Sequence, residues 1–366
     1  MAELFLELFT EEIPSKLQID AREKIKNIIH EKLKKKEISF KNIKSFSTPK
    51  RLALVMDGIP EKIEQKKKII KGPNINAPET AIEGFMKSNN LNKADLYKKK
   101  IEKGEFYFAE TQPKTIDVLR ELQQIIPESL KAYSWKKSMK WSIYDLNWGR
   151  PLKSIIALFN NQVINFNFFH LKSSNLILIE ELEEDRVKKV DSFKSYLSIL
   201  KSQNIILDHE IRKNFILKKM NKICVSKKLK NNFDTKLVDE VTNLVEWPNV
   251  ILGKFDDNYL KIPKEILIVT MQQHQKYFPL FDNNNKLTNL FLFIANLPDK
   301  KGYIKQGNQR VIEARLSDAK FFWEKNKNQN LVKQVSKLKN LSFFNQLGTF
   351  YDRTQRLRQL GNPVSY

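Results

Sequence analysis

Cations, amides and aromatic rings are denser between Glu246 and Trp323 than elsewhere in the 366-residue chain. Three side chains of this stretch are suited to meet phosphates, namely Lys276, Arg310 and Arg315. Ammonium and guanidinium groups on a helix bind the backbone of nucleic acids, but an ordinary solvated helix face has the same composition. We therefore take Lys276, Arg310 and Arg315 as a candidate surface for RNA or for a protein partner.

A histidine in the same stretch is open to a catalytic reading and to a structural one. Helical spacing places His274 on one side with Leu267, Met271 and Phe278. A histidine on an apolar face is more often a hydrogen-bonded core group than a catalyst, so we expect His274 to be structural. The spacing of the next helix predicts a second buried stripe, formed by Ile312, Leu316, Ala319 and Trp323.

The sequence lacks the short motifs of self-sufficient active sites. It contains neither His-Glu-x-x-His nor the glycine-rich loops that hold nucleotide phosphates, and its four histidines lie far apart. We therefore predict no catalytic residue and no bound metal in this chain.

Composition favours a polyanionic partner. With 65 Lys+Arg against 42 Asp+Glu, the net charge is +23, which favours nucleic acid first and an anionic membrane surface second. The alternative is a compositional bias toward Lys, Asn and Ile. Cys224 is the only cysteine, the N-terminus lacks a basic leader, and no apolar run approaches about 18 residues. These features predict a soluble cytoplasmic protein.

Hydrophobic periodicity predicts strands and helices without regular βαβ alternation. Residues 3–9 alternate, with Leu4, Leu6 and Leu8 on one face and Phe5, Glu7 and Phe9 on the other. Further strands are predicted at 52–56, 97–101, 105–110, 154–159, 163–169, 250–252 and 287–294. Helices are predicted from Pro14 to about Lys36 and at 81–87, 116–126, 128–133, 186–200, 208–224, 235–245, 263–278, 308–323, 331–338 and 341–360. The order of these elements favours the α+β class.

Trp141, Trp148 and Arg150 allow two interpretations. Aromatic and guanidinium planes both stack on RNA bases. Tryptophans beside a strand are also ordinary core residues, and we favour that second interpretation.

Several motifs, in order and spacing over nearly the whole chain, carry a family resemblance. They are Leu6–Pro14, Thr48–Ala53, Lys71–Pro73, Gly84–Phe85, Lys137–Trp141, Arg150–Pro151, Val245–Pro248, Met271–Phe278, Gly307–Leu316, Asp318–Ala319, Phe321–Trp323 and Leu347–Thr349. With these motifs the chain resembles the N-terminal portion of the β subunit of the heterotetrameric bacterial glycyl-tRNA synthetase.

The resemblance implies an α2β2 ligase that attaches glycine to tRNA(Gly) at the expense of ATP. In that family the α subunit carries the adenylate-forming site, where ATP is used, and the β subunit binds tRNA. The implied fold is α+β, with a mixed sheet body that resembles the B3/B4 domains of the phenylalanyl enzyme's β subunit. An all-helical HD-like domain follows that body.

We accordingly expect residues 1–325 to form the body, with a helical insertion near 186–245, and residues 326–366 to begin the HD-like domain. The chain is shorter than family members, so we expect it to be truncated within that domain, before the family's anticodon-binding domain. It also lacks the Thr-x-Gly-His-Arg-Phe-like segment of the family between Leu171 and Glu184. Two alternatives stay open: a stand-alone RNA-binding protein, and a non-functional truncated derivative of the same fold.

Overall fold

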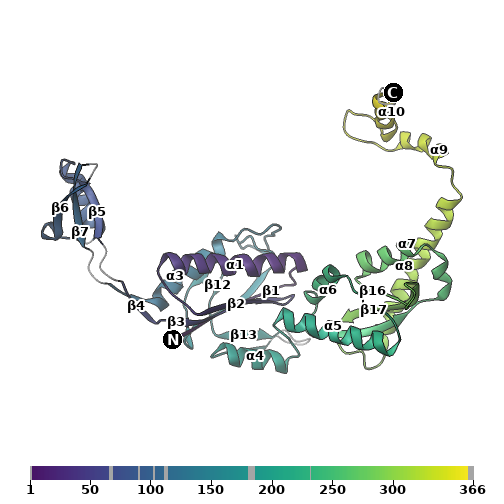
Figure 1. Cartoon of the computed structure of the whole chain (residues 1–366), viewed down its shortest axis with the longest axis horizontal. Coiled ribbons are helices and arrows are strands. Elements are labelled where there is room, and N and C mark those ends of the chain that lie inside the picture. The colour runs from purple at the N-terminus through teal and green to yellow at the C-terminus, as the bar shows by residue number, and fades with distance from the viewer. Residues whose placement is uncertain are drawn as a thin grey trace. The chain divides into compact units, whose positions relative to one another are not determined.

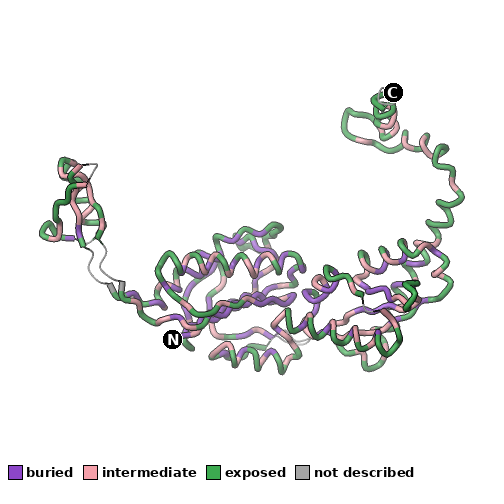
Figure 2. The backbone as a smooth tube through the Cα atoms, viewed as in Figure 1, coloured by how far each residue is buried: buried purple, intermediate pink, exposed green. Residues whose placement is uncertain are grey.

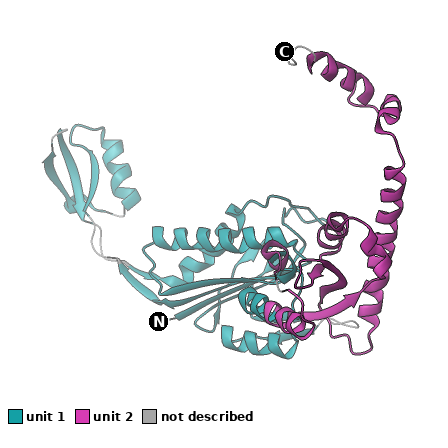
Figure 3. Cartoon of the chain, turned by 45° about the vertical axis from the view of Figure 1, so that its right-hand side comes forward, with its two compact units in different colours: residues 1–215, 239–247 teal, residues 216–238, 248–366 magenta. Residues whose placement is uncertain are grey.

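The computed structural model describes residues 2–65, 69–89, 91–101, 104–110, 114–179, 186–230 and 232–361. The chain divides into two units, coloured separately in Figure 3. Unit 1 comprises residues 1–215 and 239–247, and unit 2 comprises residues 216–238 and 248–366. Unit 1 is therefore discontinuous in sequence.

A five-stranded antiparallel sheet forms the centre of unit 1. Its strand order is β10-β9-β1-β3-β2. The strands are β1 (Ala2–Thr10), β2 (Asn42–Ser47), β3 (Arg51–Ile59), β9 (Leu152–Phe159) and β10 (Gln162–Val163). The predicted strands at 3–9, 52–56 and 154–159 are thereby confirmed, and the antiparallel pairing agrees with the α+β class.

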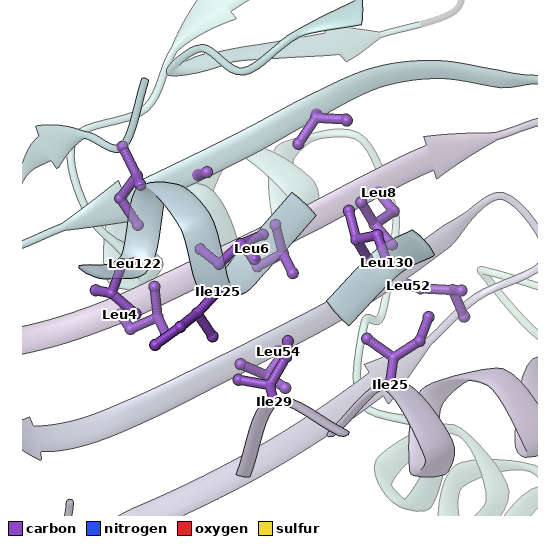
Figure 4. Packing of buried hydrophobic residues seen from close by; sticks show 14 of the residues in the cluster. Leu4, Leu6, Leu8, Ile25, Ile29, Leu52, Leu54, Leu122, Ile125 and Leu130 are labelled. Carbon is purple, nitrogen blue, oxygen red and sulfur yellow. The ribbon is translucent and has the colours of Figure 1, made fainter. Parts of the chain in front are cut away.

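Both faces of this sheet are buried, because each face is covered by helices (Figure 1). Helices α1 (Ser15–Lys35) and α3 (Val118–Ala132) pack on the face formed by Leu4, Leu6 and Leu8, as Figure 4 shows. Helix α4 (Phe193–Ser202) packs on the opposite face, where its Tyr196 lies at 4.7 Å from the ring of Phe5. The predicted alternation of β1 is confirmed, with each set of side chains in its own core.

The turn between β9 and β10 follows from its two asparagines. Asn160 and Asn161 have φ values of 47° and 65°. Two consecutive residues with positive φ are what a tight hairpin turn needs, and asparagine tolerates this conformation well. The predicted second strand is shorter than expected, because β10 ends at Val163 and the chain pairs again only at β11 (Asn167–Phe168) with β12 (Leu171–Lys172).

Two predictions in unit 1 are wrong. Pro127 does not separate two helices but lies inside α3, because the buried face of that helix outweighs the one lost backbone hydrogen bond. Arg186–Lys189 is not helical either: it forms strand β14, which pairs with β13 (Leu176–Ile179). The helix begins only at α4, where the Ser192 hydroxyl caps its first turn. Of the segment Leu171–Glu184, where we expect a departure from the family, residues 180–184 lie outside the described residues.

A small module leaves the sheet of unit 1 between two short paired strands, β4 (Lys62–Gln65) and β8 (Lys114–Asp117). The module itself has strand order β5-β7-β6 and, in its described part, one α-helix and one 3-10 helix. Its elements are β5 (Ile69–Asn74), α2 (Glu79–Asn89), η1 (Lys93–Asp95), β6 (Leu96–Ile101) and β7 (Gly104–Glu110). The predicted hairpin of 97–101 and 105–110 and the helix at 81–87 are confirmed.

Two predicted helices follow. Helix α5 (His209–Ser226) is confirmed, and α6 (Thr235–Thr242) is confirmed in a shorter form than predicted.

Unit 2 contains a three-stranded antiparallel sheet of order β15-β17-β16 with helices packed on it. The strands are β15 (Asn249–Lys254), β16 (Phe278–Phe281) and β17 (Leu287–Ala295). Between β15 and β16 lie η2 (Asp257–Lys261), α7 (Lys264–Val269) and the π-helical turn η3 (Thr270–His274), and α8 (Tyr303–Lys327) follows the sheet. The core combines Leu267, Met271, Phe291, Ile312 and Leu316, each fully buried.

The C-terminal part of unit 2 differs from the prediction. Ile312 and Leu316 are buried as expected, but Ala319 is half-buried and Trp323 is exposed, and residues 317–361 include no buried residue (Figure 2). Helix α8 therefore continues beyond the core that holds its first half. The helices after it are α9 (Leu331–Gln334), the 3-10 helix η4 (Val335–Asn340) and α10 (Phe350–Gly361). The prediction of helix from 341 is wrong for 341–349, where Gly348 takes a φ of 77°.

Candidate RNA and partner interface

Two segments singled out by sequence, Met271–Phe278 and Gly307–Leu316, meet in unit 2. The hydroxyl of Tyr277 donates to the Oδ1 atom of Asn308 at 2.6 Å, and the Asn308 amide donates to the carbonyl of Ile304 at 2.8 Å. Burial raises the pKa of Tyr277 to about 12, so the phenol keeps its proton and remains a donor at neutral pH. This bond joins the start of α8 to the turn that carries Lys276.

Lys276 is positioned by a left-handed backbone conformation. Its φ is 60°, and the N–H of Tyr277 just after it donates to the carbonyl of Met271 at 2.9 Å. A non-glycine residue with positive φ costs about 1 kcal/mol or more, so the closed turn and its buried neighbours have to maintain it. The backbone at Lys276 is therefore held in the turn that follows η3, and the Lys276 side chain is half-buried.

Arg310 and Arg315 both lie on exposed positions of α8. They are five residues apart, which corresponds to about 140° around the helix axis at 100° per residue. Arg310, two residues beyond Asn308, lies about 160° around the axis from it and so faces away from the junction that Asn308 makes with Tyr277. Arg315, seven residues beyond Asn308, lies about 20° from it, about two turns further along α8. The structure therefore places Arg310 and Arg315 on different sides of α8, with Arg315 on the side of the Tyr277–Asn308 junction.

The expected place of His274 on an apolar face is wrong. Leu267, Met271 and Phe278 are buried, but His274 is exposed. The cause is the π-helical turn η3, which adds a residue to the turn and rotates the following positions away from the side that ordinary helical spacing gives. Phe278 reaches the core from strand β16 instead.

Sequence reasoning missed a buried ionic cluster in unit 1. The Oε1 atom of Glu7 accepts from the Nη1 of Arg51 and from the hydroxyl of Tyr196, each at 2.6 Å. The guanidinium of Arg51 also donates to the carbonyl of Leu178 at 3.0 Å and lies 4.2 Å from the centre of the Phe9 ring.

The side chains of Glu7 and Arg51 are 0% and 3% exposed, so this cluster links β1, β3, α4 and β13 and is not accessible to a ligand. The available signal was a carboxylate within an apolar strand pattern, because such a group needs a buried partner.

A second buried cation organises the loops at one end of the unit 1 sheet. The guanidinium of Arg212 is 0% exposed and donates to four backbone carbonyls at 2.5 to 3.2 Å. The acceptors are Ser47, Ile206, Leu207 and Thr242. Burial lowers the pKa of Arg212 to about 10, so it stays charged at neutral pH.

The motifs Thr48–Ala53 and Val245–Pro248 are connected at the same place. The Thr48 hydroxyl donates to the Oε1 atom of Glu246 at 2.6 Å. Nearby, burial and the charge of Arg22 lower the pKa of His209 to about 4, so this histidine is neutral at pH 7. These contacts are structural, because they bind parts of unit 1 to one another.

A cavity of about 510 Å³ lies in unit 1 beside Trp148, one of the two tryptophans that we considered for base stacking. Its wall includes Tyr133, Trp135, Trp148 and Phe169. Trp148 is 1% exposed and packs edge to face on Trp135 at 5.1 Å, which confirms its core role.

The other two candidates for stacking do not form an open platform. Trp141 is half-buried and packs against the same core, and Arg150 donates to the carbonyl of Gly149 at 3.0 Å.

Within the residues that the structure describes, no group of three or more histidine, cysteine, aspartate or glutamate side chains is arranged to hold a metal ion. In the same part of the chain, no helix combines the length and apolarity needed to cross a membrane. Cys224, the single cysteine, is buried.

The geometry so far defines a basic α+β protein whose buried ionic groups are structural and whose exposed cations lie on helix and strand faces. A sequence model described as the glycyl-tRNA synthetase beta subunit matches residues 4–365. The chain is 36% identical over 366 residues to the glycine--tRNA ligase beta subunit of Rickettsia peacockii (strain Rustic), covering 100% of the chain and 55% of that relative. It is 36% identical to the corresponding protein of Rickettsia typhi (strain ATCC VR-144 / Wilmington), covering 98% of the chain and 54% of the relative.

The chain therefore belongs to the glycyl-tRNA synthetase beta subunit family. It spans about half the length of the curated relatives that it matches.

Proposed function

We propose that this chain supports the ATP-dependent attachment of glycine to tRNA(Gly), by binding tRNA while an α subunit carries the adenylate-forming site. The observation that carries the proposal is the family match over residues 4–365, together with the names of the relatives. The net charge of +23 agrees with an RNA ligand. We place the activity in the cytoplasm, in an α2β2 assembly that uses ATP at the α-subunit site.

For the architecture, we propose that residues 1–325 correspond to a B3/B4-like body and that residues 326–366 begin an HD-like helical domain. Support for the first part comes from the helix-covered antiparallel sheet of unit 1. Support for the second comes from the mainly helical chain after Lys327.

Within this function we propose that Lys276, Arg310 and Arg315 contact RNA or the partner, with Arg315 on the side of α8 that forms the junction with η3 and Arg310 on the opposite side. Exposed cations of this kind bind phosphates without selecting sequence. Arg310→Ala is expected to weaken tRNA binding and to lower the slope of log K against log salt by about 1. Arg358→Ala removes an exposed arginine from α10 and is the matched control, for which we expect a smaller change.

The test of the whole function mixes the purified chain with α subunit, ATP, glycine and tRNA(Gly). We expect co-elution with the α subunit in gel filtration and more glycyl-tRNA than the α subunit forms alone. Failure to associate with the α subunit would contradict the proposal. If tRNA still bound with steep salt dependence, that result would favour the alternative of a stand-alone RNA-binding protein.

A further inference from the structure

In the module formed by β5, α2, β6 and β7, the helix covers only one face of the small sheet. Helix α2 packs on β5 from that face, as Figure 3 shows, and the ring of Phe85 lies where a side chain on Gly72 would be. Ala109 points to the same side and is 0% exposed. Since successive side chains of a strand alternate between faces, Phe106 and Phe108 point to the face opposite Ala109.

That second face consists mainly of aromatic rings and lysines. Cross-strand partners point to the same side of a sheet, and Phe108 pairs with Lys71 on β5 and with Tyr97 on β6, while Phe106 pairs with Lys99. We call Lys71, Tyr97, Lys99, Phe106 and Phe108 the aromatic face. Tyr97 and both lysines are exposed, and the two phenylalanines are half-buried.

The rings of the aromatic face are covered by ammonium groups instead of by apolar side chains. The Nζ atom of Lys71 lies 3.6 Å from the centre of the Phe106 ring, and that of Lys99 lies 5.8 Å from the Phe108 ring. The rings of Tyr97 and Phe108 are stacked at 6.1 Å. Cations over ring faces are favourable contacts that a planar base and its phosphate can replace, because the base stacks on the ring and the ammonium moves to the phosphate.

We propose that the aromatic face binds unpaired nucleotides of RNA. Phe106 and Phe108 lie two residues apart on the middle strand, about 6.6 Å along it, so that neighbouring nucleotides can each stack on one ring. Lys71 and Lys99 lie on either side of these rings and supply the charge that the RNA backbone needs. The choice of RNA as the ligand rests on the proposed function, whereas the stacking surface rests on the module alone.

The test measures binding of the full chain to a fluorescein-labelled single-stranded RNA of about a dozen nucleotides, by fluorescence anisotropy. Phe108→Leu keeps an apolar side chain at a half-buried position but removes the ring. It is expected to weaken binding about tenfold, and Phe108→Tyr is expected to retain it. Unchanged circular dichroism of Phe108→Leu shows that the module is folded, and equal binding by Phe108→Leu and the unchanged chain would overturn the proposal.

Lys98 and Lys99 provide a matched pair of variants. Both are exposed neighbours on β6, but only Lys99 lies on the aromatic face. Lys99→Ser should weaken binding more than Lys98→Ser, although both remove one charge. Equal losses of RNA affinity in the two variants would mean that the net charge of the chain alone attracts RNA. That result would overturn the assignment of the aromatic face to RNA and favour a protein partner for it.

A parallel titration with tRNA(Gly) separates this inference from the proposed function. Binding of tRNA with no effect of Phe108→Leu on either RNA rejects the aromatic face and retains the function. Ring-dependent binding of the single-stranded RNA without tRNA binding rejects the function and retains the aromatic face.

Discussion

Replacing Arg51 by methionine should destabilise unit 1 strongly. The substitution removes the guanidinium from the Oε1 atom of Glu7, at 2.6 Å, and leaves the carboxylate 0% exposed with the hydroxyl of Tyr196 as its remaining donor in that cluster. Breaking a buried ion pair by removing one partner costs about 3–5 kcal/mol. For a unit of this size that corresponds to a fall of about 6–20 °C in the melting temperature.

Tryptophan fluorescence during urea or thermal unfolding reports on this change. Unit 1 contains Trp135, Trp141, Trp148 and Trp247, and unit 2 contains Trp323. The matched control is Lys32→Met, because the Lys32–Glu128 pair has the same 2.6 Å separation but lies on the surface, where solvent screens it.

We expect Lys32→Met to leave the unfolding midpoint nearly unchanged. The double variant Glu7→Leu with Arg51→Met should recover most of the loss, since no buried charge is then left unpaired. If Arg51→Met shifted the midpoint no further than Lys32→Met does, the reasoning from burial would be refuted.

Three further predictions concern stability. Because the pKa of His209 is lowered from 6.5 to about 4 in the folded chain, the unfolded chain binds the proton more readily. The stability should therefore fall as the pH is lowered from about 6.5 to about 4. Urea titrations across this pH range should show that His209→Gln loses the dependence. Gly149→Ala places a Cβ 2.4 Å from the Trp135 ring and should destabilise the protein by about 1–3 kcal/mol. A Cβ at Gly307 in helix α8 would meet no atom within 4 Å, so Gly307→Ala should stabilise the protein by about 0.5–1 kcal/mol. Similar unfolding midpoints for the two variants would contradict the packing argument. Pro127→Ala should stabilise α3 by about 1–3 kcal/mol by restoring a backbone donor, and a lower urea midpoint would count against it.

The local sequence pattern was sufficient to predict an element where the residues of that element alone determine its conformation. The alternation of β1 predicted both of its faces, and prolines 14 and 263 correctly indicated where helices begin. The turn at Asn160 and Asn161 is local in the same sense, since the positive φ values that it requires depend on the residues themselves.

Prediction failed where distant partners decide. Arg186–Lys189 has no strand signal of its own and becomes a strand because Leu176–Ile179 offers a free edge. His274 moved to the surface because one π-helical turn changes the spacing on which the prediction depended.

The candidate site shows the same division. Helical spacing placed Met271 on an apolar side and Ile312 in a buried stripe, and both residues are buried in the core of unit 2. The bond from Tyr277 to Asn308 joins residues 31 positions apart, and no spacing rule predicts it.

The four carbonyls held by Arg212 bear on the order in which this protein folds during synthesis. Ser47 is translated early, but Thr242, which accepts from the same guanidinium, is translated about 200 residues later. Residues 216–238, assigned to unit 2, emerge from the ribosome before residues 239–247, the last segment of unit 1. Before Thr242 emerges, burying the Arg212 guanidinium would leave one of its N–H groups without an acceptor, which is unfavourable. The nascent unit 1 should therefore stay sensitive to protease until residue 247 has left the exit tunnel. A ribosome stalled before Thr242 would therefore display an incompletely closed unit, and one stalled well after it a closed one.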